Sequence, residues 1–299
     1  MGVARPRFSI VTASFNQAQF LAETIASVRD QGRDDVEHLV FDGGSTDGSV
    51  DVLRAHDAEL AYWVSAPDRG QSSAWNAGWR RARGEIVAFI NSDDLLLPGA
   101  IDAMARLADG APGAEWLVGG TKYFGEGAPP LTYPGTPQVS AADVLFFASY
   151  APQPGQFFRK SLIERVGGFD ETLRYSFDLD FFVRCALEGA HSVATPRIVA
   201  AFRFHGASKT VSQADRHLAE TRAVEARLWP QVLAREGRRA RHVRADYHGH
   251  KALERSRDAL AAGNRSEGWR LLAHAVREYP TLLATRALYG TLQRLLGLR

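Results

Sequence analysis

The chain has 299 residues, of which 45% are hydrophobic, 23% charged and 10% aromatic, and its formal net charge is +2. This composition is typical of a globular protein and excludes a disordered or fibrous chain, and the length allows a large core without covalent cross-links. The single cysteine, Cys185, excludes a disulfide framework and a cysteine-based structural zinc site.

The charges are unevenly distributed along the chain. Residues 211–299 contain 17 Lys and Arg and 9 Asp and Glu, a balance of +8, whereas residues 1–210 contain 19 and 25, a balance of −6. Such a shift marks a candidate boundary within the chain. The first 15 residues lack a secretory signal pattern, and no run of about 18 uncharged apolar residues is present. We therefore expect a cytoplasmic protein.

The first 100 residues alternate between the periodicity of strands and that of helices. The predicted strands cover residues 8–12, 36–41, 61–64 and 85–90, and the predicted helices cover 19–28, 50–55 and 72–83, with a further helix whose first turn suits Pro98. This alternation predicts an α/β fold with a Rossmann-like, mostly parallel sheet and helices on both faces.

The rest of the chain is less regular. Residues 110–156 are rich in Gly and Pro, which predicts long loops with one strand near residues 116–118. Short strand and helix segments are expected over 157–166 and 179–187, followed by a late strand over 198–204. From about residue 213 onward the pattern is helical, so we predict a C-terminal helical region.

Polar side chains follow each of the four predicted N-terminal strands. Asn16 follows the first strand and Asp42 closes the second. Asp68 and Arg69 follow the third strand, and the pair Asp93-Asp94 follows the fourth. Parallel sheets bind ligands at the carboxyl ends of their strands. The four clusters therefore predict one composite site.

Each of these clusters also has a structural interpretation. Asp93 and Asp94 could place an oxygen on Mg²⁺ or Mn²⁺, or they could be a solvated loop residue and a helix cap. Asp42 suits a base or ribose contact and equally the first position of an Asp-Gly turn. Arg69 suits a diphosphate contact and equally a surface ion pair with Asp68.

Two candidate groups lie later in the chain. Asp178 follows Phe177 in an aromatic stretch, where burial would raise the pKa of its carboxyl and suit a general base. The alternative is an acid near the positive end of a helix dipole. His205 closes the late strand and is either a structural histidine or, beside Lys209, a contact for a metal or a diphosphate.

The order of these motifs resembles that of the inverting family 2 glycosyltransferases, which have the GT-A fold. The resemblance to their N-terminal half rests on VTASFNQAQFLAETIASVRDQ, VFDGGSTDGSVDVL and PDRGQSSAWNAGWRRARGEIVAFINSDDLLLPGAI, and that to their acceptor-side half on QPGQFFRKSLIERVGGFDETLRYSFDLDFFVR. It covers about residues 8–210. It implies a GT-A domain over 1–212, with a nucleotide-binding half over about 8–110 and an acceptor-side half over about 111–212, followed by a basic helical region over 213–299.

The resemblance also implies roles for individual residues. Asp178 takes the place of the catalytic base, and Asp93 and His205 take the places of metal ligands, with Asp94 as a further candidate. The residues implied in binding the nucleotide sugar are Ala13, Phe15, Asn16, Asp42, Arg69, Asn76, Ser92 and Lys209. The chain departs from the family pattern at Asn91, which replaces the first Asp of the DxD motif, and at Phe177, which replaces an acid before the base.

These features predict a metal-dependent, inverting glycosyltransferase. It would use Mn²⁺ or Mg²⁺ and a nucleotide-sugar donor, with UDP-sugars favoured, and transfer the sugar to a hydroxyl of a glycan, lipid-linked or protein acceptor in cell-surface polysaccharide or glycan synthesis. The metal and Arg69 or Lys209 would neutralise the leaving diphosphate, and Asp178 would take the acceptor proton.

Two other functions are compatible with parts of the pattern. A nucleotidyltransferase would carry a Gly-rich loop with Lys or Arg after the first strand, and residues 13–16 do not form one. A catalytically silent module that binds sugar nucleotides or glycans would be consistent with Asn91 and Phe177.

The basic C-terminal region has no assigned chemistry. Its few aromatic residues and the lack of a nucleic-acid-binding motif indicate that it does not bind nucleic acid. One interpretation is a solvated helix face. The other is an amphipathic helix over the leucine-rich residues 282–296, which would contact a membrane surface or a second copy of the chain.

Overall fold

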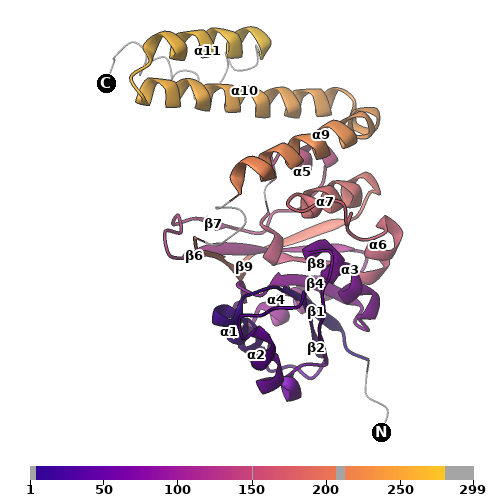
Figure 1. Cartoon of the computed structure of the whole chain (residues 1–299). Helices are drawn as coiled ribbons and strands as arrows, with labels where there is room; N and C mark the ends of the chain where they lie inside the picture. Colours follow the sequence, from indigo (N-terminus) through magenta and orange to yellow (C-terminus); the bar gives the residue numbers. More distant parts are fainter. Residues whose placement is uncertain (1–4, 150, 207–212, 280–299) are drawn as a thin grey trace.

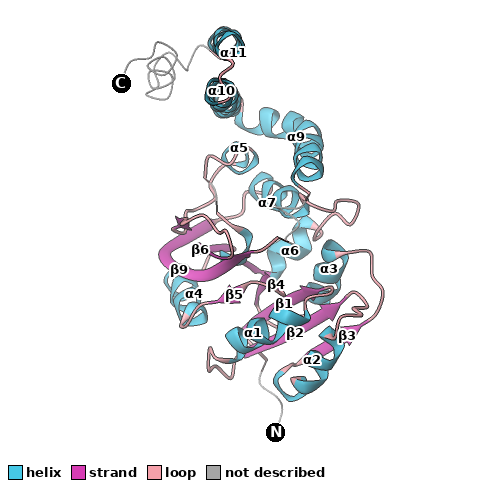
Figure 2. Ribbon diagram, turned by 60° about the vertical axis from the view of Figure 1, so that its left-hand side comes forward, coloured by secondary structure: helices cyan, strands magenta, loops and turns pink. Residues whose placement is uncertain are grey.

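The computed structural model describes residues 5–149, 151–206 and 213–279. A nine-stranded sheet crosses this part of the molecule in the order β3-β2-β1-β4-β8-β6-β9-β5, with β7 paired to β6. Helices lie on both faces of the sheet (Figure 2). The strands are β1 Phe8–Ser14, β2 Val36–Asp42, β3 Tyr62–Ser65, β4 Ile86–Asn91, β5 Leu95–Leu96, β6 Trp116–Gly125, β7 Thr132–Tyr133, β8 Gln156–Arg159 and β9 Ser192–Phe204.

The N-terminal half of the sheet is parallel, as predicted. Strands β3, β2, β1 and β4 pair side by side in the same direction. Val11 and Phe89 face one hydrophobic cluster, whereas Ile10 and Ala88 face another on the opposite side. A strand that is buried on both faces is rich in apolar residues, which is why these strands could be predicted.

Four α-helices connect and cover these strands. They are α1 Ala18–Arg29, α2 Ser49–Ala55, α3 Gln71–Arg81 and α4 Ala100–Gly110, with the short helix η1 Asp57–Glu59 after α2. Residues of α3 join the cluster on one face of the sheet, and residues of α4 join the cluster on the other. Helix α4 begins after the N-cap residue Gly99, so Pro98 precedes the helix and does not lie in its first turn.

The Gly- and Pro-rich segment is more ordered than the prediction of long loops allowed. It contains the ten-residue strand β6 and the helix α5 Ala141–Leu145. A Cβ atom on Gly119 would lie 2.3 Å from Val199 Cγ2, and one on Gly120 would lie 2.8 Å from the carbonyl oxygen of Tyr133. These glycines therefore allow β9 and β7 to pack closely against β6, and they do not mark a loop.

The second half of the sheet is mixed. Strand β8 pairs antiparallel with β4 and β6, and β9 pairs parallel with β6 and antiparallel with β5. The remaining elements up to residue 187 are the short helix η2 Gln153–Gly155, α6 Lys160–Val166 and α7 Phe177–Leu187. Helix α7 buries Phe181, Phe182 and Val183 against the same face of the sheet as α3.

Three long helices follow the sheet: α9 Ala214–Glu236, α10 Arg238–Ala261 and α11 Arg265–Glu278. Helix α9 lies against α5 and α7, and α10 and α11 lie side by side farther from the sheet (Figure 1). Val224, Leu228 and Val232 of α9 belong to the same hydrophobic cluster as the sheet residues, and so does Ala240 at the start of α10. The rest of α10 shares a small cluster with α11 around Leu253 and Leu272. The helical region is confirmed, and a domain boundary at residue 212 stays a prediction.

No helix among the described residues combines the length and the apolar character that crossing a membrane requires. The predicted amphipathic helix over residues 282–296 lies outside the described residues.

Candidate active site

A cavity of about 780 Å³ lies at the carboxyl ends of β1 and β4. Its lining comes from the segments that follow β1, β2, β3 and β4 and from the C-terminal half of the chain. The contributing residues are Ala13–Gln17, Gly43, Pro67, Asp68, Gly70, Gln71, Ala74, Trp75, Asn91–Asp93, Gln153, Arg174, Tyr175, Phe177, Asp178, Phe202, Gln213 and His217. The polar segments that follow the four N-terminal strands thus lie around one cavity at the predicted edge of the sheet.

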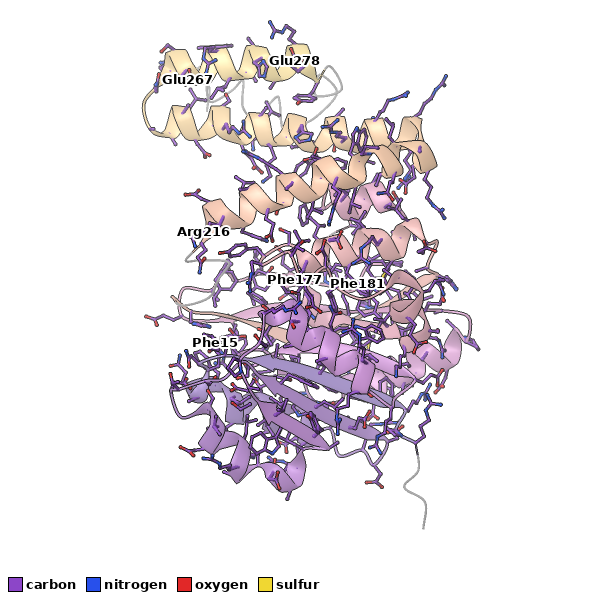
Figure 3. All side chains as sticks on the ribbon, turned by 45° about the vertical axis from the view of Figure 1, so that its right-hand side comes forward. Phe15, Phe177, Phe181, Arg216, Glu267 and Glu278 are labelled. Atoms are coloured by element: carbon purple, nitrogen blue, oxygen red, sulfur yellow. The ribbon has the colours of Figure 1, made fainter. Side chains whose placement is uncertain are left out.

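The segment after β1 forms one rim of the cavity. Ala13, Phe15 and Asn16 all line it, and the Phe15 side chain is 61% exposed. Figure 3 shows Phe15 at the edge of the sheet and Phe177 between the sheet and the C-terminal helices. Asn16 has a positive φ of 53°, and its Oδ1 accepts a hydrogen bond of 3.0 Å from the Thr46 backbone N–H. An exposed aromatic face at this rim suits a planar base.

Asp42 is buried beneath the cavity and does not line it. Its Oδ2 accepts hydrogen bonds from the Ser45 backbone N–H at 2.8 Å and from the Ser65 hydroxyl at 2.6 Å. The carboxylate therefore shapes the turn after β2, as the structural interpretation of this residue proposed. A Cβ atom on Gly43 in that turn would lie 3.3 Å from Phe15 Cδ2, so the turn reaches the cavity rim.

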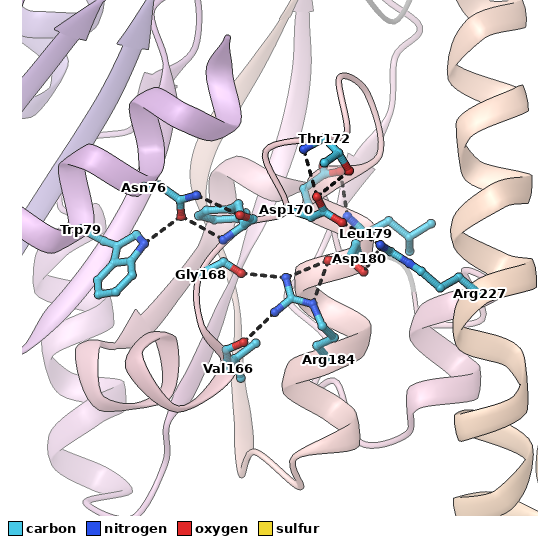
Figure 4. Close-up of polar contacts among 12 residues, drawn as sticks. Asn76, Trp79, Val166, Gly168, Asp170, Thr172, Leu179, Asp180, Arg184 and Arg227 are labelled. Carbon is cyan, nitrogen blue, oxygen red and sulfur yellow. Dashed lines mark hydrogen bonds and ion pairs between the residues drawn. The ribbon is translucent and has the colours of Figure 1, made fainter. Parts of the chain in front are cut away.

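Arg69 and Asn76 also lie outside the cavity lining. The Arg69 side chain is 81% exposed and has Glu171 Oε2 at 3.8 Å. Asn76 is buried, and its amide donates to the Phe169 carbonyl oxygen at 2.8 Å while it accepts from the Phe169 N–H and from Trp79 Nε1, both at 2.9 Å (Figure 4). Asn76 thus fastens the loop before α7 to α3. Lys209 lies outside the described residues.

Asp93 and His205 meet at the cavity margin. Asp93 Oδ2 lies 2.9 Å from His205 Nε2, and Asp93 and Ser92 line the cavity. The backbone carbonyl of Ser92 accepts a hydrogen bond of 2.9 Å from the Thr24 hydroxyl, which fixes this turn to α1. A carboxylate and an imidazole at this distance are two of the ligands that a divalent cation would take. The described residues hold no group of three such ligands.

Asp94 is buried away from the cavity lining. Its Oδ1 accepts the Arg203 backbone N–H at 2.8 Å, and its Oδ2 accepts Asn91 Nδ2 at 3.0 Å. Burial, with the nearby charge of Asp93, raises the pKa of the Asp94 carboxyl well above its usual range. The geometry therefore gives Asp94 a structural position next to β9 rather than that of a metal ligand.

Asp178 lies in the first turn of α7 and lines the cavity. Burial raises the pKa of its carboxyl, although the Leu179 backbone N–H donates to Oδ1 at 2.8 Å and opposes the shift. The preceding residue, Phe177, is buried with its ring centroid 5.3 Å from that of Trp75. Aromatic rings therefore lie close to this carboxylate, and the charge of Glu220 also contributes to its raised pKa. A raised pKa makes a carboxylate a stronger proton acceptor at neutral pH.

The sequence-based site did not include several lining residues. Arg174 and Tyr175 lie just before α7, and Gln213 and His217 lie at the start of α9. Gln213 and His217 fall in the region for which no chemistry was predicted. Their spacing of four residues places them on one face of a helix, but a polar helix face alone cannot be distinguished from a solvated one.

Four buried polar atoms of lining residues have no hydrogen-bond partner within the described part of the chain. They are Ser14 Oγ, Gln17 Oε1, Trp75 Nε1 and Gln153 Oε1. Gln153 Nε2 donates to the Phe89 carbonyl oxygen at 2.6 Å, which fixes the orientation of its amide. By contrast, Trp116 Nε1 donates to Gln156 Oε1 at 2.8 Å. Since an unpaired buried polar group costs about 1–3 kcal/mol, their concentration around one cavity indicates a polar ligand.

The chain is similar in sequence to known glycosyltransferases. Residues 9–133 match the family model for glycosyl transferase family 2. The uncharacterized glycosyltransferase Rv1514c of Mycobacterium tuberculosis is 33% identical over 186 residues, which cover 61% of this chain and 70% of the relative. A PGL/p-HBAD biosynthesis glycosyltransferase of Mycobacterium bovis is 26% identical over 257 residues, which cover 78% of this chain and 94% of the relative.

Solved structures share the fold. Staphylococcus aureus TarS 1–349 in complex with UDP-GlcNAc has a TM-score of 0.64 at 17% identity, with 92% of this chain and 82% of that chain covered. The mannosyltransferase PcManGT of Pyrobaculum calidifontis, in complex with GDP-Man and Mn²⁺, has a TM-score of 0.59 at 20% identity, with 98% and 85% covered. The chain spans 43% of the length of a longer TarS structure. These likenesses confirm the predicted GT-A fold class.

The hydrogen bonds of Asn76 should stabilise the folded chain. Replacing Asn76 by alanine leaves the N–H and C=O of Phe169 and the indole N–H of Trp79 without these partners. We expect Asn76→Ala to lower the free energy of unfolding by at least about 2 kcal/mol, measured by urea denaturation. The control is Ser73→Ala on the same helix, which should change it by less than about 0.5 kcal/mol. Equal stability of the two variants would contradict a structural role for Asn76.

Proposed function

The chain belongs to glycosyltransferase family 2, and on this premise we propose that it transfers a sugar from a nucleoside-diphosphate donor to an acceptor hydroxyl with inversion at the anomeric carbon. One observation carries the proposal: a single cavity holds the Asp93–His205 pair at its margin, Asp178 in its wall and four unpartnered polar atoms in its lining. We propose a glycan, lipid-linked or protein acceptor, as in the synthesis of cell-surface polysaccharides.

The donor would lie along the carboxyl ends of β1 and β4. We propose that the base binds near Phe15 and the turn at Gly43, and that the diphosphate lies near Ser92 and Asp93. A UDP-sugar is the donor we favour, because TarS, with the higher of the two TM-scores, was solved with UDP-GlcNAc. The GDP-mannose complex of PcManGT makes GDP-sugars the comparison to test.

A divalent cation fits the residues at the cavity margin. Mg²⁺ and related cations at nucleotide sites take one or two carboxylates, together with substrate phosphates and water, so Asp93 and His205 supply enough protein ligands. When bound, the cation would supply positive charge to the leaving diphosphate. Arg174 lines the same cavity and is a second source of positive charge there, whereas Arg69 lies outside the lining.

Asp178 would act as the general base. As the acceptor oxygen bonds to the anomeric carbon and the bond from that carbon to the diphosphate oxygen breaks, the acceptor proton passes to the Asp178 carboxylate. A single displacement of this kind needs one base and inverts the configuration. The buried setting, which raises the pKa of Asp178, strengthens it as a proton acceptor.

Asp178→Asn tests the base. We expect the release of nucleoside diphosphate from UDP-GlcNAc or GDP-mannose, in the presence of acceptor or water, to slow by about 10²- to 10⁴-fold, while donor binding measured by calorimetry changes little. An unchanged rate in Asp178→Asn would contradict the assignment.

The rate of the wild type should rise with pH through the pKa of Asp178, because the deprotonated carboxylate is the active form. Burial shifts this pKa above its usual range.

Asp93→Asn tests the cation site. In thermal-shift measurements of the wild type, Mn²⁺ should increase the stabilisation given by UDP or GDP, because a ligand that binds the folded state raises its stability. Loss of one metal ligand should weaken this cation-dependent binding by at least about tenfold. Mn²⁺ without nucleotide is the control, and an equal cation-dependent increment in Asp93→Asn would rule out Asp93 as a ligand.

A further inference from the structure

Helix α9 carries two carboxylates that each bind the start of another helix. Glu220 lies near the first residues of α9 and contacts the segment before α7. Glu236 is the last residue of α9 and contacts the start of α5. Figure 1 shows α9 crossing above both helices. In both contacts a carboxylate accepts hydrogen bonds from backbone N–H groups, but only the contact of Glu220 adjoins the cavity.

Glu220 binds three consecutive backbone N–H groups. Its Oε1 accepts from Arg174 at 2.9 Å, and its Oε2 accepts from Tyr175 at 2.5 Å and from Ser176 at 2.7 Å. Ser176 is the N-cap residue of α7, and its hydroxyl lies 2.9 Å from the Thr221 hydroxyl. Of these three groups, the Ser176 N–H lies at the helix start, where N–H groups lack partners within the helix and a carboxylate also complements the helix dipole.

This contact fixes the segment that carries the proposed base. Asp178 lies two residues after Ser176 and in the first turn of α7, so the position of residues 174–176 determines where its carboxylate lies in the cavity. We infer that Glu220 is a positioning residue for Asp178 and that α9 is thereby part of the active site. The inference rests on the proposed function, because it assumes that Asp178 is the base.

A second set of contacts holds α9 in place independently of Glu220. Arg227 pairs with Asp170 Oδ2 and Asp180 Oδ1, both at 2.6 Å, and Asp180 Oδ2 accepts from Arg184 Nε at 2.8 Å (Figure 4). The apolar side chains of α9 belong to the main core cluster. Replacing Glu220 should therefore leave α9 docked and loosen residues 174–176, although the contact between the Ser176 and Thr221 hydroxyls remains.

Glu236 provides a matched control. Its Oε1 accepts the Ala141 N–H at 2.6 Å, and its Oε2 accepts the Ser140 hydroxyl at 2.7 Å. None of the residues of α5 is among those that line the cavity. Glu236→Gln and Glu220→Gln thus weaken the same kind of contact on the same helix. The contact of Glu220 lies next to the proposed base, and that of Glu236 does not.

The two variants should differ in kcat. For release of nucleoside diphosphate from UDP-GlcNAc and GDP-mannose, we expect Glu220→Gln to lower kcat by about 10- to 100-fold. The donor KM should rise by a smaller factor, because Arg174 lies in the loosened segment whereas Phe15 and Asp93 do not. Glu236→Gln should leave both parameters within about twofold of the wild type, although both variants lose thermal stability. An unchanged kcat in Glu220→Gln, or equal losses in the two variants, would overturn the inference.

Hydrogen exchange measured by mass spectrometry separates this inference from the proposed function. Exchange of the backbone amides of residues 174–176 should accelerate in Glu220→Gln and not in Glu236→Gln. Unchanged exchange there would overturn the inference whether or not the protein is active. A wild type that releases nucleoside diphosphate from neither donor, with accelerated exchange in Glu220→Gln, would instead count against the proposed function while supporting the contact on which the inference depends.

Discussion

Parallel pairing of β1 with both β2 and β4 is the constraint on which the site depends. In this register Ala13 lies opposite Phe41 on one side and Asn91 on the other, so the three strands end at the same edge of the sheet. The segments that follow them must then turn over that edge together. This arrangement brings Phe15, Gly43 and Asp93 around one cavity, although they are far apart along the chain. Backbone pairing in the core therefore gives the proposed donor site its shape.

Ion pairs hold the basic C-terminal region against the acidic part of the chain. The sequence divides into an acidic part and a basic part, and their opposite charges meet in the folded chain. Arg227 of α9 pairs with Asp170 and Asp180, and Arg239 at the start of α10 pairs with Asp143 of α5. Glu220 adds a contact of the opposite sense, from a carboxylate to backbone N–H groups. Part of the basic region thus binds the acidic body, and α9 completes one wall of the cavity with Gln213 and His217.

Local patterns explain how far the sequence could predict this structure. Strands β1, β2 and β4 were predictable because burial on both faces favours largely apolar runs. Only the first residues of β6 were predicted, because Gly119 and Gly120, which allow close packing with its neighbours, are also typical of loops. Asp42 and Asn76 could not be placed, because whether a buried polar side chain faces a cavity or its own backbone depends on partners such as Ser65 and Phe169. The contacts of α9 with the start of α7 join residues more than 40 positions apart, and no local periodicity encodes them. The roles of the site residues stay predictions.

We propose that this cavity binds the diphosphate of a nucleotide sugar beside a cation. A crystal structure of the protein grown with UDP and Mn²⁺, with anomalous scattering measured from manganese, would test this proposal. We expect one strong anomalous peak between Asp93 and His205, with the diphosphate of UDP next to it and the base near Phe15. A peak at another position, or UDP bound outside the cavity at the carboxyl ends of β1 and β4, would contradict it.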